Sequence, residues 1–563
     1  MKLKLYIVFF CIMLIALPVS MAGQGVILPS GIYMKLSQAT MVLQGNWVNN
    51  GNYSDQNGTI IINGNTDISG SSLNTFGNVT IIPGATLSID PQNSVTVSGA
   101  LTNNADTSGL VLKSDTTGTA SLIHNTNNVA ATDQRYISGA EEAWHFLSSP
   151  VSDQNIGGSW LPSGTYGNGT GYDLYLWNEP NSCWIYKLNT TSTINWNTVH
   201  PGSDFVVGRG YLYSVQATNP TKAFVGNLNN GSISYGLASS SGDVNLKGFN
   251  LVGNPYPSSI DWQAASGWTR SNLVSTGGGY DMWIWNPAAN NYGVFNSVTG
   301  IGTNSVTRYI APMQGYFVLA SSAGNLGVDN NIRVHNGAGN WFKSTGITPG
   351  LLSVVVQSET DNSFDEVSLL FGYSTNQPGA TKLFSRVVTA PSLFMPSGSE
   401  YCSVRYLTST IDNTTVPVMF KPGRDGNYTL KCNFDENEFG IVTLEDRQTN
   451  YIQNMKAGNT YSFQSSTFDD VSRFVLHFGP GNESAYNKLP ARIYTDGIQL
   501  IIDLTLIGKE SEAFVYDATG RLLLQKTLQG LTLYKFNINA KSQILIVYLK
   551  NQQGNLCRKL FFN

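Results

Sequence analysis

Charged side chains are scarce in this chain of 563 residues. Asp, Glu, Lys and Arg together make up 12% of the sequence, and the formal net charge is −4. The chain therefore lacks a basic field that would attract the phosphates of a nucleic acid. We expect no nucleic acid partner.

Cysteine is also sparse, with five residues in the whole chain. Cys11 lies in an apolar N-terminal run and lacks the small preceding residues of a lipidated cysteine, so we expect no lipid anchor there. The other four are too few to cross-link a fold of this size with disulfides, and large β cores are stable without such cross-links. Cys402 and Cys432 fall in one expected domain, which makes them the candidate disulfide.

Recognisable catalytic constellations are missing. The five histidines are scattered, and none forms an HExxH pair or joins a cysteine cluster or a G-x-S-x-G elbow. Acidic residues gather at 141–142, 361–366 and 435–438, but a glycosidase needs two carboxylates across a cleft, which a sequence cannot place. Solvated turns explain these clusters. We expect no catalytic residues, no metal and no cofactor, and we favour a protein that is not an enzyme.

Long apolar runs are absent except at the N-terminus. Lys2 and Lys4 precede an apolar run over 5–19 and a small residue at Ala22. This order predicts a signal peptide over 1–22, cleaved between Ala22 and Gly23 by signal peptidase after entry into the general secretory pathway. The run is too short to span a bilayer, so we expect no transmembrane segment in the mature chain.

Glycine, Asn, Ser and Thr are abundant, which favours β-strands joined by tight turns. Over 25–125, short segments such as Gly58-Thr-Ile-Ile-Ile-Asn-Gly64 and Ser94-Val-Thr-Val-Ser-Gly99 alternate apolar with polar residues. Their close spacing predicts the rungs of a parallel β-solenoid, each stacked on its neighbour. A small β-sandwich would give similar local patterns, and we favour the solenoid.

An internal duplication occupies residues 130–340. Three ordered segments recur at a nearly constant offset of 105 to 108 residues, which predicts two copies of one β-unit over about 130–245 and 246–340. The matching segments are 144–150 with 249–255, 171–178 with 279–286, and 210–213 with 315–318.

Nine of the eleven tryptophans fall within this duplicated region. Flat aromatic faces can stack on sugar rings, so Trp177, Trp184, Trp283 and Trp285 are candidate ligand residues. However, Trp177 and Trp285 recur in register between the copies, as a shared core would require. We therefore favour a structural role and keep glycan binding as the alternative.

Beyond the repeats, apolar segments with turn signals between them predict a β-sandwich over 345–480, followed by a Gly/Pro-containing linker at 481–491. The tail, 492–563, again reads as strands and turns. The segment Val515-Tyr-Asp-Ala-Thr-Gly-Arg521 contains a hairpin turn, and Lys559-Leu-Phe-Phe closes the chain.

This tail resembles the type A-like C-terminal sorting domain of proteins exported by the type IX secretion system of Bacteroidetes. The resemblance rests on a hydrophobic-Tyr-Asp-x-x-Gly-Arg hairpin, although Gln543 and Leu545 replace the Gly and Tyr of the family's next strand. The matching motif residues are Tyr516, Asp517, Gly520, Arg521, Val547 and Lys559. The amino-acid sequence of the duplicated region also resembles an uncharacterised region that is common in proteins exported by this system.

The resemblance implies a small Ig-like β-sandwich at the C-terminus and recognition of this tail by the type IX machinery. It also implies passage through the periplasm to the cell surface or the medium, with attachment to surface glycolipid as one outcome. We therefore expect an all-β, exported protein of structural or adhesive role. The alternatives are a glycan-binding module protein and, less favoured, a polysaccharide-degrading enzyme.

Overall fold

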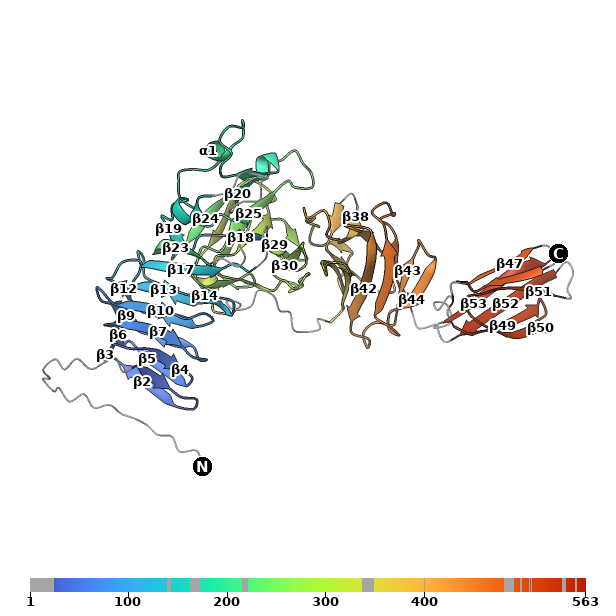
Figure 1. Ribbon diagram of the computed structural model, residues 1–563, viewed down its shortest axis with the longest axis horizontal. Helices are drawn as coiled ribbons and strands as arrows, with labels where there is room; N and C mark the ends of the chain where they lie inside the picture. The colour runs from blue at the N-terminus through green and yellow to red at the C-terminus, as the bar shows by residue number, and fades with distance from the viewer. Residues whose placement is uncertain are drawn as a thin grey trace, which may run out of the picture. The chain divides into compact units, whose positions relative to one another are not determined.

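The computed structural model describes residues 25–138, 143–162, 173–214, 221–336, 349–398, 400–479, 491–496, 499–505, 507, 509–538, 543–551 and 554–562. The described chain is nearly all β, as the composition predicts. It forms two compact units (Figure 1). The first comprises Met1–Pro287 and Gly293–Ser344, and the second Ala288–Tyr292 and Thr345–Asn563. The predicted cleavage site at Ala22 and Gly23 lies outside the described residues.

The first unit begins with a parallel β-solenoid of about five turns, which confirms the predicted solenoid. Its strands stack in parallel sheets, drawn in blue in Figure 1. One sheet holds β1 (Val26–Leu28), β4 (Trp47–Asn49), β7 (Asn65–Ser69), β10 (Thr86–Ile89), β13 (Leu110–Leu112) and β17 (Ala130–Tyr136). A second holds β3 (Thr40–Leu43), β6 (Thr59–Ile62), β9 (Asn78–Ile81) and β12 (Leu101–Asn103). The remaining parallel pairs join β2 (Tyr33–Ser37) with β5 (Asn52–Gln56), and β8 (Asn74–Phe76) with β11 (Ser94–Val97) and β16 (Ser121–His124).

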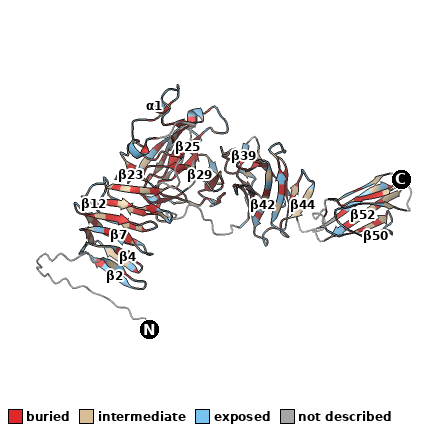
Figure 2. Cartoon of the chain, viewed as in Figure 1, coloured by how far each residue is buried: buried red, intermediate tan, exposed pale blue. Residues whose placement is uncertain are grey.

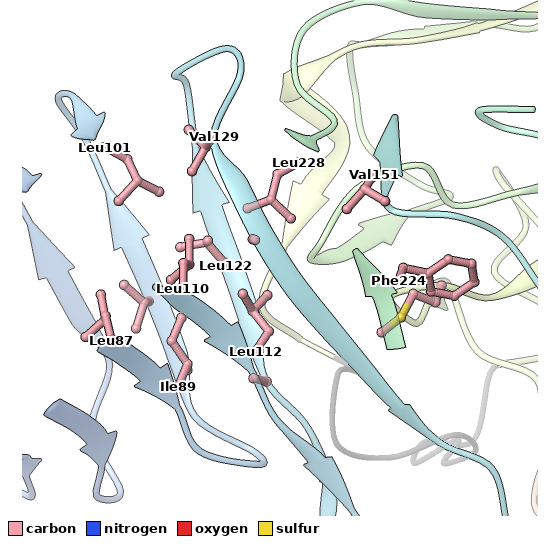
Figure 3. Close-up of a cluster of buried hydrophobic side chains, with 14 of the residues drawn as sticks. Leu87, Ile89, Leu101, Leu110, Leu112, Leu122, Val129, Val151, Phe224 and Leu228 are labelled. Carbon is pink, nitrogen blue, oxygen red and sulfur yellow. The ribbon is translucent and has the colours of Figure 1, made fainter. Parts of the chain in front are cut away.

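Alternating residues explain why these short strands stack. Ile60 is buried and pairs with Val79, which pairs in turn with Leu101 on the next rung, so one apolar column runs through three rungs. Figure 3 shows the neighbouring column, in which Leu87 lies beside Leu110. The intervening Thr and Ser positions face outward and stay partly exposed, as Figure 2 shows by colour. Each rung thus buries its apolar face only against its neighbours.

An antiparallel strand ends the stack. The strand β23 (Thr221–Leu228) pairs with the last rung β17 over seven residues, and β19 (Val151–Ser152) pairs with the other edge of β23. Phe224 and Leu228 of β23 join the solenoid core (Figure 3). The strand that follows the last sheet strand of the first copy therefore closes the solenoid at this end.

The predicted duplication is visible as two sheets that share the same order of four strands; the sheet of the second copy has a fifth strand, β28 (Ser275–Thr276), which also pairs with β29. The first copy has the order β18 (Trp144–Leu147), β22 (Tyr211–Ser214), β20 (Asp173–Asn178), β21 (Cys183–Tyr186). The second has β25 (Phe249–Gly253), β32 (Gly315–Leu319), β29 (Gly279–Asn286), β30 (Asn291–Asn296).

The register also repeats. In the first copy Trp144 lies opposite Ser214, and in the second Phe249 lies opposite Leu319, so both partners are shifted by 105 residues. The copies also contact each other reciprocally, which relates them by a local pseudo-twofold axis. The equivalent backbone contacts are Leu147–Gln314 with Val252–Arg209, and Ser148–Met313 with Gly253–Gly208.

Short elements complete the first unit. They are β14 (Ser114–Asp115), β15 (Gly118–Thr119), β24 (Ile233–Leu237), β26 (Ser259–Asp261), β27 (Trp268–Thr269), β28 (Ser275–Thr276), β31 (Tyr309–Ile310), β33 (Gly324–Val328), β34 (Arg333–Val334), the 3-10 turns η1 (Gly158–Trp160), η2 (Glu179–Asn181) and η3 (Asn330–Ile332), and the helix α1 (Trp196–Val199).

The second unit opens with two six-stranded sheets around one apolar core. One sheet is β37 (Gln377–Pro378), β40 (Val404–Leu407), β36 (Phe364–Phe371), β35 (Leu351–Ser358), β42 (Gly426–Phe434) and β45 (Thr460–Ser465). The other is β39 (Glu400–Cys402), β38 (Ser392–Ser397), β41 (Thr415–Lys421), β46 (Phe474–Gly479), β43 (Ile441–Asp446) and β44 (Tyr451–Asn454).

The candidate disulfide is wrong. Cys402 and Cys432 are buried free thiols on different sheets of this sandwich. The Cys402 thiol donates to the Met395 carbonyl at 3.4 Å, and burial raises the pKa of both thiols to about 12. Both side chains act as small apolar residues of the core.

The C-terminal module, residues 491–562, is a smaller sandwich with a core of its own. A three-stranded sheet contains β47 (Arg492–Asp496), β48 (Gln499–Asp503) and β51 (Leu533–Asn537). A four-stranded sheet contains β50 (Leu522–Leu528), β49 (Ser511–Asp517), β52 (Gln543–Asn551) and β53 (Gly554–Phe562). Every residue of this core cluster comes from the module itself.

Candidate functional site

The outer surface of the four-stranded sheet in the C-terminal module is unusually apolar. Along β49, Ala513 and Val515 are buried, whereas Phe514 and Tyr516 alternate with them and stay partly exposed. Because successive strand residues point to opposite sides of a sheet, Phe514 and Tyr516 face away from the core. An outward position on a small domain would ordinarily be polar.

Cross-strand pairing extends this surface over β52 and β53. Tyr516 lies opposite Ile546, which lies opposite Lys559. Directly paired residues share a face of the sheet. The same pairing places Tyr548 between Phe514 and Cys557. We define the outer face as Phe514, Tyr516, Ile544, Ile546, Tyr548, Cys557, Lys559 and Phe561.

Ring contacts order the aromatic part of the outer face. The Phe514 and Tyr516 rings lie 6.5 Å apart with an angle of 10° between their planes, and Tyr548 lies 6.2 Å from Phe514. The Lys550 ammonium sits 5.4 Å from the centre of the Phe514 ring. The result is an aromatic strip with the Lys550–Glu512 ion pair, 3.1 Å long, beside it.

Two of the six predicted motif residues therefore meet on the outer face. Tyr516 and Lys559 are 43 residues apart in the sequence, yet only Ile546 separates them across the sheet. Val547 points the other way, is fully buried and lies opposite Val515 in the core. It maintains the fold, so the motif contains both surface and core positions.

The other three motif residues build the hairpin turn between β49 and β50. The Asp517 carboxylate accepts from the Thr519 hydroxyl at 2.6 Å and from the Arg521 amide and Nε at 3.0 Å each. Gly520 has φ +85°, a conformation that costs a residue with a side chain free energy. The bonds from Thr519 and Arg521 lower the pKa of Asp517 to about 2, so the turn stays closed by an ionised carboxylate at neutral pH.

Sequence reasoning missed the neighbours that make the motif a surface. Phe514, Ile546, Tyr548 and Phe561 were not among the predicted site residues. The signal was present, because segments 512–516 and 544–548 are apolar at nearly every position, and a strand with only one buried face should alternate. The departures Gln543 and Leu545 lie at and beside the start of β52, where Leu545 fills the core.

The candidate ligand aromatics of the duplicated region lie mostly in a core. Trp177, Trp283 and Trp285 are between 1% and 6% exposed, and Trp184 is partly exposed at the edge of the same cluster. The Trp177 indole donates to the Phe249 carbonyl of the other copy at 2.6 Å. A sugar cannot stack on rings that are already enclosed, so three of the four residues cannot form a platform in this conformation.

Two further searches give no site in the described part of the chain. No group of three or more His, Cys, Asp or Glu side chains there is placed to hold a metal ion. Among those same residues, no helix is long and apolar enough to cross a membrane.

These features define an all-β protein in which a solenoid and a pseudo-symmetric pair of sheets precede two sandwiches. The chain belongs to the family described as "Domain of unknown function (DUF8693)", whose model matches residues 42–351, more than half of its length. The match spans most of the solenoid and both copies of the repeat.

No curated protein matches this sequence. One solved structure, "Biofilm associated protein - BSP domain", is 10% identical and covers 77% of this chain and 92% of its own, with a TM-score of 0.12. That score is too low to indicate a shared fold.

Proposed function

We propose that this protein is an exported surface or secreted protein of structural or adhesive role, and that its C-terminal module directs the export. The observation that carries this proposal is the outer face, on which Tyr516 of β49 and Lys559 of β53 are separated only by Ile546. An apolar strip on a small domain has no role in that domain's own core, and such surfaces mark interaction sites.

The partners follow from the resemblance of the tail. The signal peptide would take the chain through the general secretory pathway, signal peptidase would cleave after Ala22, and the type IX machinery would then bind the outer face. The separate core of the module supports this division, because a targeting module has to fold without the cargo. Attachment to surface glycolipid would follow export.

The remainder of the chain suits a scaffold. Stacked rungs and a pseudo-symmetric pair of sheets bury their apolar faces in continuous cores, which makes a stiff support for a binding surface. The described residues offer no converging catalytic groups on which an enzymatic proposal could rest.

Substitution of the outer face tests the proposal. Tyr516→Ser combined with Lys559→Ala should leave the module folded, because neither side chain belongs to its core, but should remove the contact with the export machinery. We expect the variant to accumulate in the periplasm of a type IX-competent host, measured by cell fractionation and immunoblotting.

The matched control is Tyr494→Ser, which removes an exposed tyrosine from β47 on the other sheet of the same module. This variant should reach the surface or the medium like the unmodified chain. Equal export of the double variant and the control would contradict the proposed role of the outer face.

A further inference from the structure

The two six-stranded sheets of the second unit form what we call the large sandwich. One end of it brings four loops together into a single surface. The loops are 359–363, 386–391, 422–425 and 466–473. Arg424 forms an ion pair with Asp361 at 2.7 Å, which joins the first loop to the third. Gly423 packs so closely on the second loop that a Cβ there would lie 2.1 Å from the Thr389 carbonyl oxygen. We call this surface the loop end.

A single aromatic side chain projects from the loop end. Phe468 is 94% exposed, the highest value among the large apolar side chains of the described chain. Val388, on the second loop, is 85% exposed. Neither side chain contributes burial to the fold, so their presence brings no stability that would explain them.

The backbone on both sides of Phe468 is fixed. The Asp425 carboxylate accepts from the Thr467 amide at 2.7 Å and from the Thr467 hydroxyl at 3.0 Å. On the other side, the Asp469 carboxylate accepts from the Ser466 amide at 2.9 Å. Loop 466–473 therefore holds the backbone of Phe468 in place before any ligand arrives, which lowers the entropy cost of binding.

The surroundings of the ring indicate what it would bind. A protein hot spot usually lies in a larger apolar patch with a polar rim, whereas Phe468 and Val388 are the only large apolar side chains of these four loops that are exposed; Val387 and Val471 are partly buried. The same loops expose Asp425, Asp470 and Arg386, and Asp425 bonds Thr467, the residue before Phe468. A ring beside carboxylates, guanidinium groups and hydroxyls suits a ligand with one apolar face and many hydroxyl groups, which is a pyranose sugar.

We propose that the loop end binds carbohydrate, with Phe468 stacking on a sugar ring and the neighbouring polar loop residues bonding its hydroxyls. This inference rests on the proposed adhesive role and names its ligand class. It places the glycan site on the large sandwich and not on the candidate tryptophans of the duplicated region, three of which are buried.

The test is binding of the purified full chain to an array of defined oligosaccharides, followed by titration of the best ligand with Phe468→Ala. Loss of the stacking contact should weaken binding about tenfold or more, which corresponds to about 1.4 kcal/mol. Thermal unfolding should not change, because the side chain is exposed. Phe468→Tyr should retain binding.

The matched control is Ile411→Ala, which removes an apolar side chain that is 80% exposed. Ile411 lies in the loop before β41, whereas the loop end follows the other end of that strand. Absence of oligosaccharide binding by the unmodified chain, or equal binding by Phe468→Ala and Ile411→Ala, would overturn the proposal. So would attachment to cells that depends on Phe468 but is not competed by free oligosaccharides, because that result would assign the ring to a protein partner. Export of Phe468→Ala is measured in parallel, which distinguishes a failure of the carbohydrate-binding proposal from a failure of the proposed export role.

Discussion

At the scale of single residues, Asp281 is a carboxyl group enclosed in the second copy of the repeat. Burial raises its pKa to about 6, even though Thr276 donates to one oxygen at 2.5 Å and Asn296 to the other at 2.8 Å. Between about pH 4 and pH 6, Asp281 therefore keeps its proton in the folded chain. In the unfolded chain, where its pKa is near the ordinary value, it has already lost that proton.

This difference makes stability depend on pH in a defined direction. A folded pKa above the unfolded one stabilises the fold at low pH, so the contribution of Asp281 to the free energy of unfolding should fall as pH rises from about 4 to about 6 and then level off. The full loss would be about 3 kcal/mol for a shift of about two pH units. Burial lowers the pKa of four histidines of the same unit to about 4, and these contribute in the opposite direction, so the Asp281 contribution is read as the difference between the unmodified chain and Asp281→Asn. Asp281→Asn should remove this contribution and leave the contributions of the other groups in place.

Urea unfolding followed by tryptophan fluorescence measures the effect selectively. All eleven tryptophans belong to the first unit, because the sequence has none in 288–292 or 345–563. A slope between pH 4 and 6 that is the same in Asp281→Asn and in the unmodified chain would show that Asp281 is not its source.

At the scale of elements, the seam between the two copies depends on a pair of equivalent glycines. A Cβ on Gly210 would lie 2.6 Å from the Val252 carbonyl oxygen, and one on Gly315 would lie 2.9 Å from the Phe146 Cβ. Both distances are too short, so Gly210→Ala and Gly315→Ala should each force the copies apart. We expect each to cost about 1–3 kcal/mol of stability.

Gly236→Ala serves as the control, because the space around that glycine, on β24, is open. It should unfold at nearly the same urea concentration as the unmodified chain, again by tryptophan fluorescence. If the two seam variants matched Gly236→Ala, the reciprocal packing of the copies would be ruled out.

The elements themselves were largely predictable from local patterns. The solenoid follows from alternation over 25–125, and the duplication follows from three matches at one offset, which the strand register reproduces. Trp177 recurs as Trp285 in the second copy, and this recurrence correctly favoured a buried structural role for both, because equivalent positions of two copies pack into equivalent cores.

The candidate sites were predictable only in part. Tyr516 and Lys559 could be named from a motif, but their meeting across Ile546 depends on the pairing of three strands, which no local pattern specifies. Phe468 carried no signal at all, because exposure depends on how four separate loops meet. The proposed Cys402–Cys432 disulfide failed for the same reason, since sharing a domain does not place two thiols on one sheet.

At the scale of the whole molecule, the chain divides its tasks among separate cores. The solenoid and first copy share one cluster of buried residues, the second copy, the large sandwich and the C-terminal module have others, and the module's cluster draws on no residue before 491. Separate cores let the solenoid with the duplicated region, the large sandwich and the C-terminal module change independently.

We propose that the C-terminal module is needed for export and not for folding. The decisive measurement is fractionation of a type IX-competent host that expresses either the full chain or a chain ending at residue 490. The shortened chain should keep the tryptophan unfolding profile of the full chain and accumulate in the periplasm. A shortened chain that is folded and still reaches the cell surface or the medium would contradict the claim.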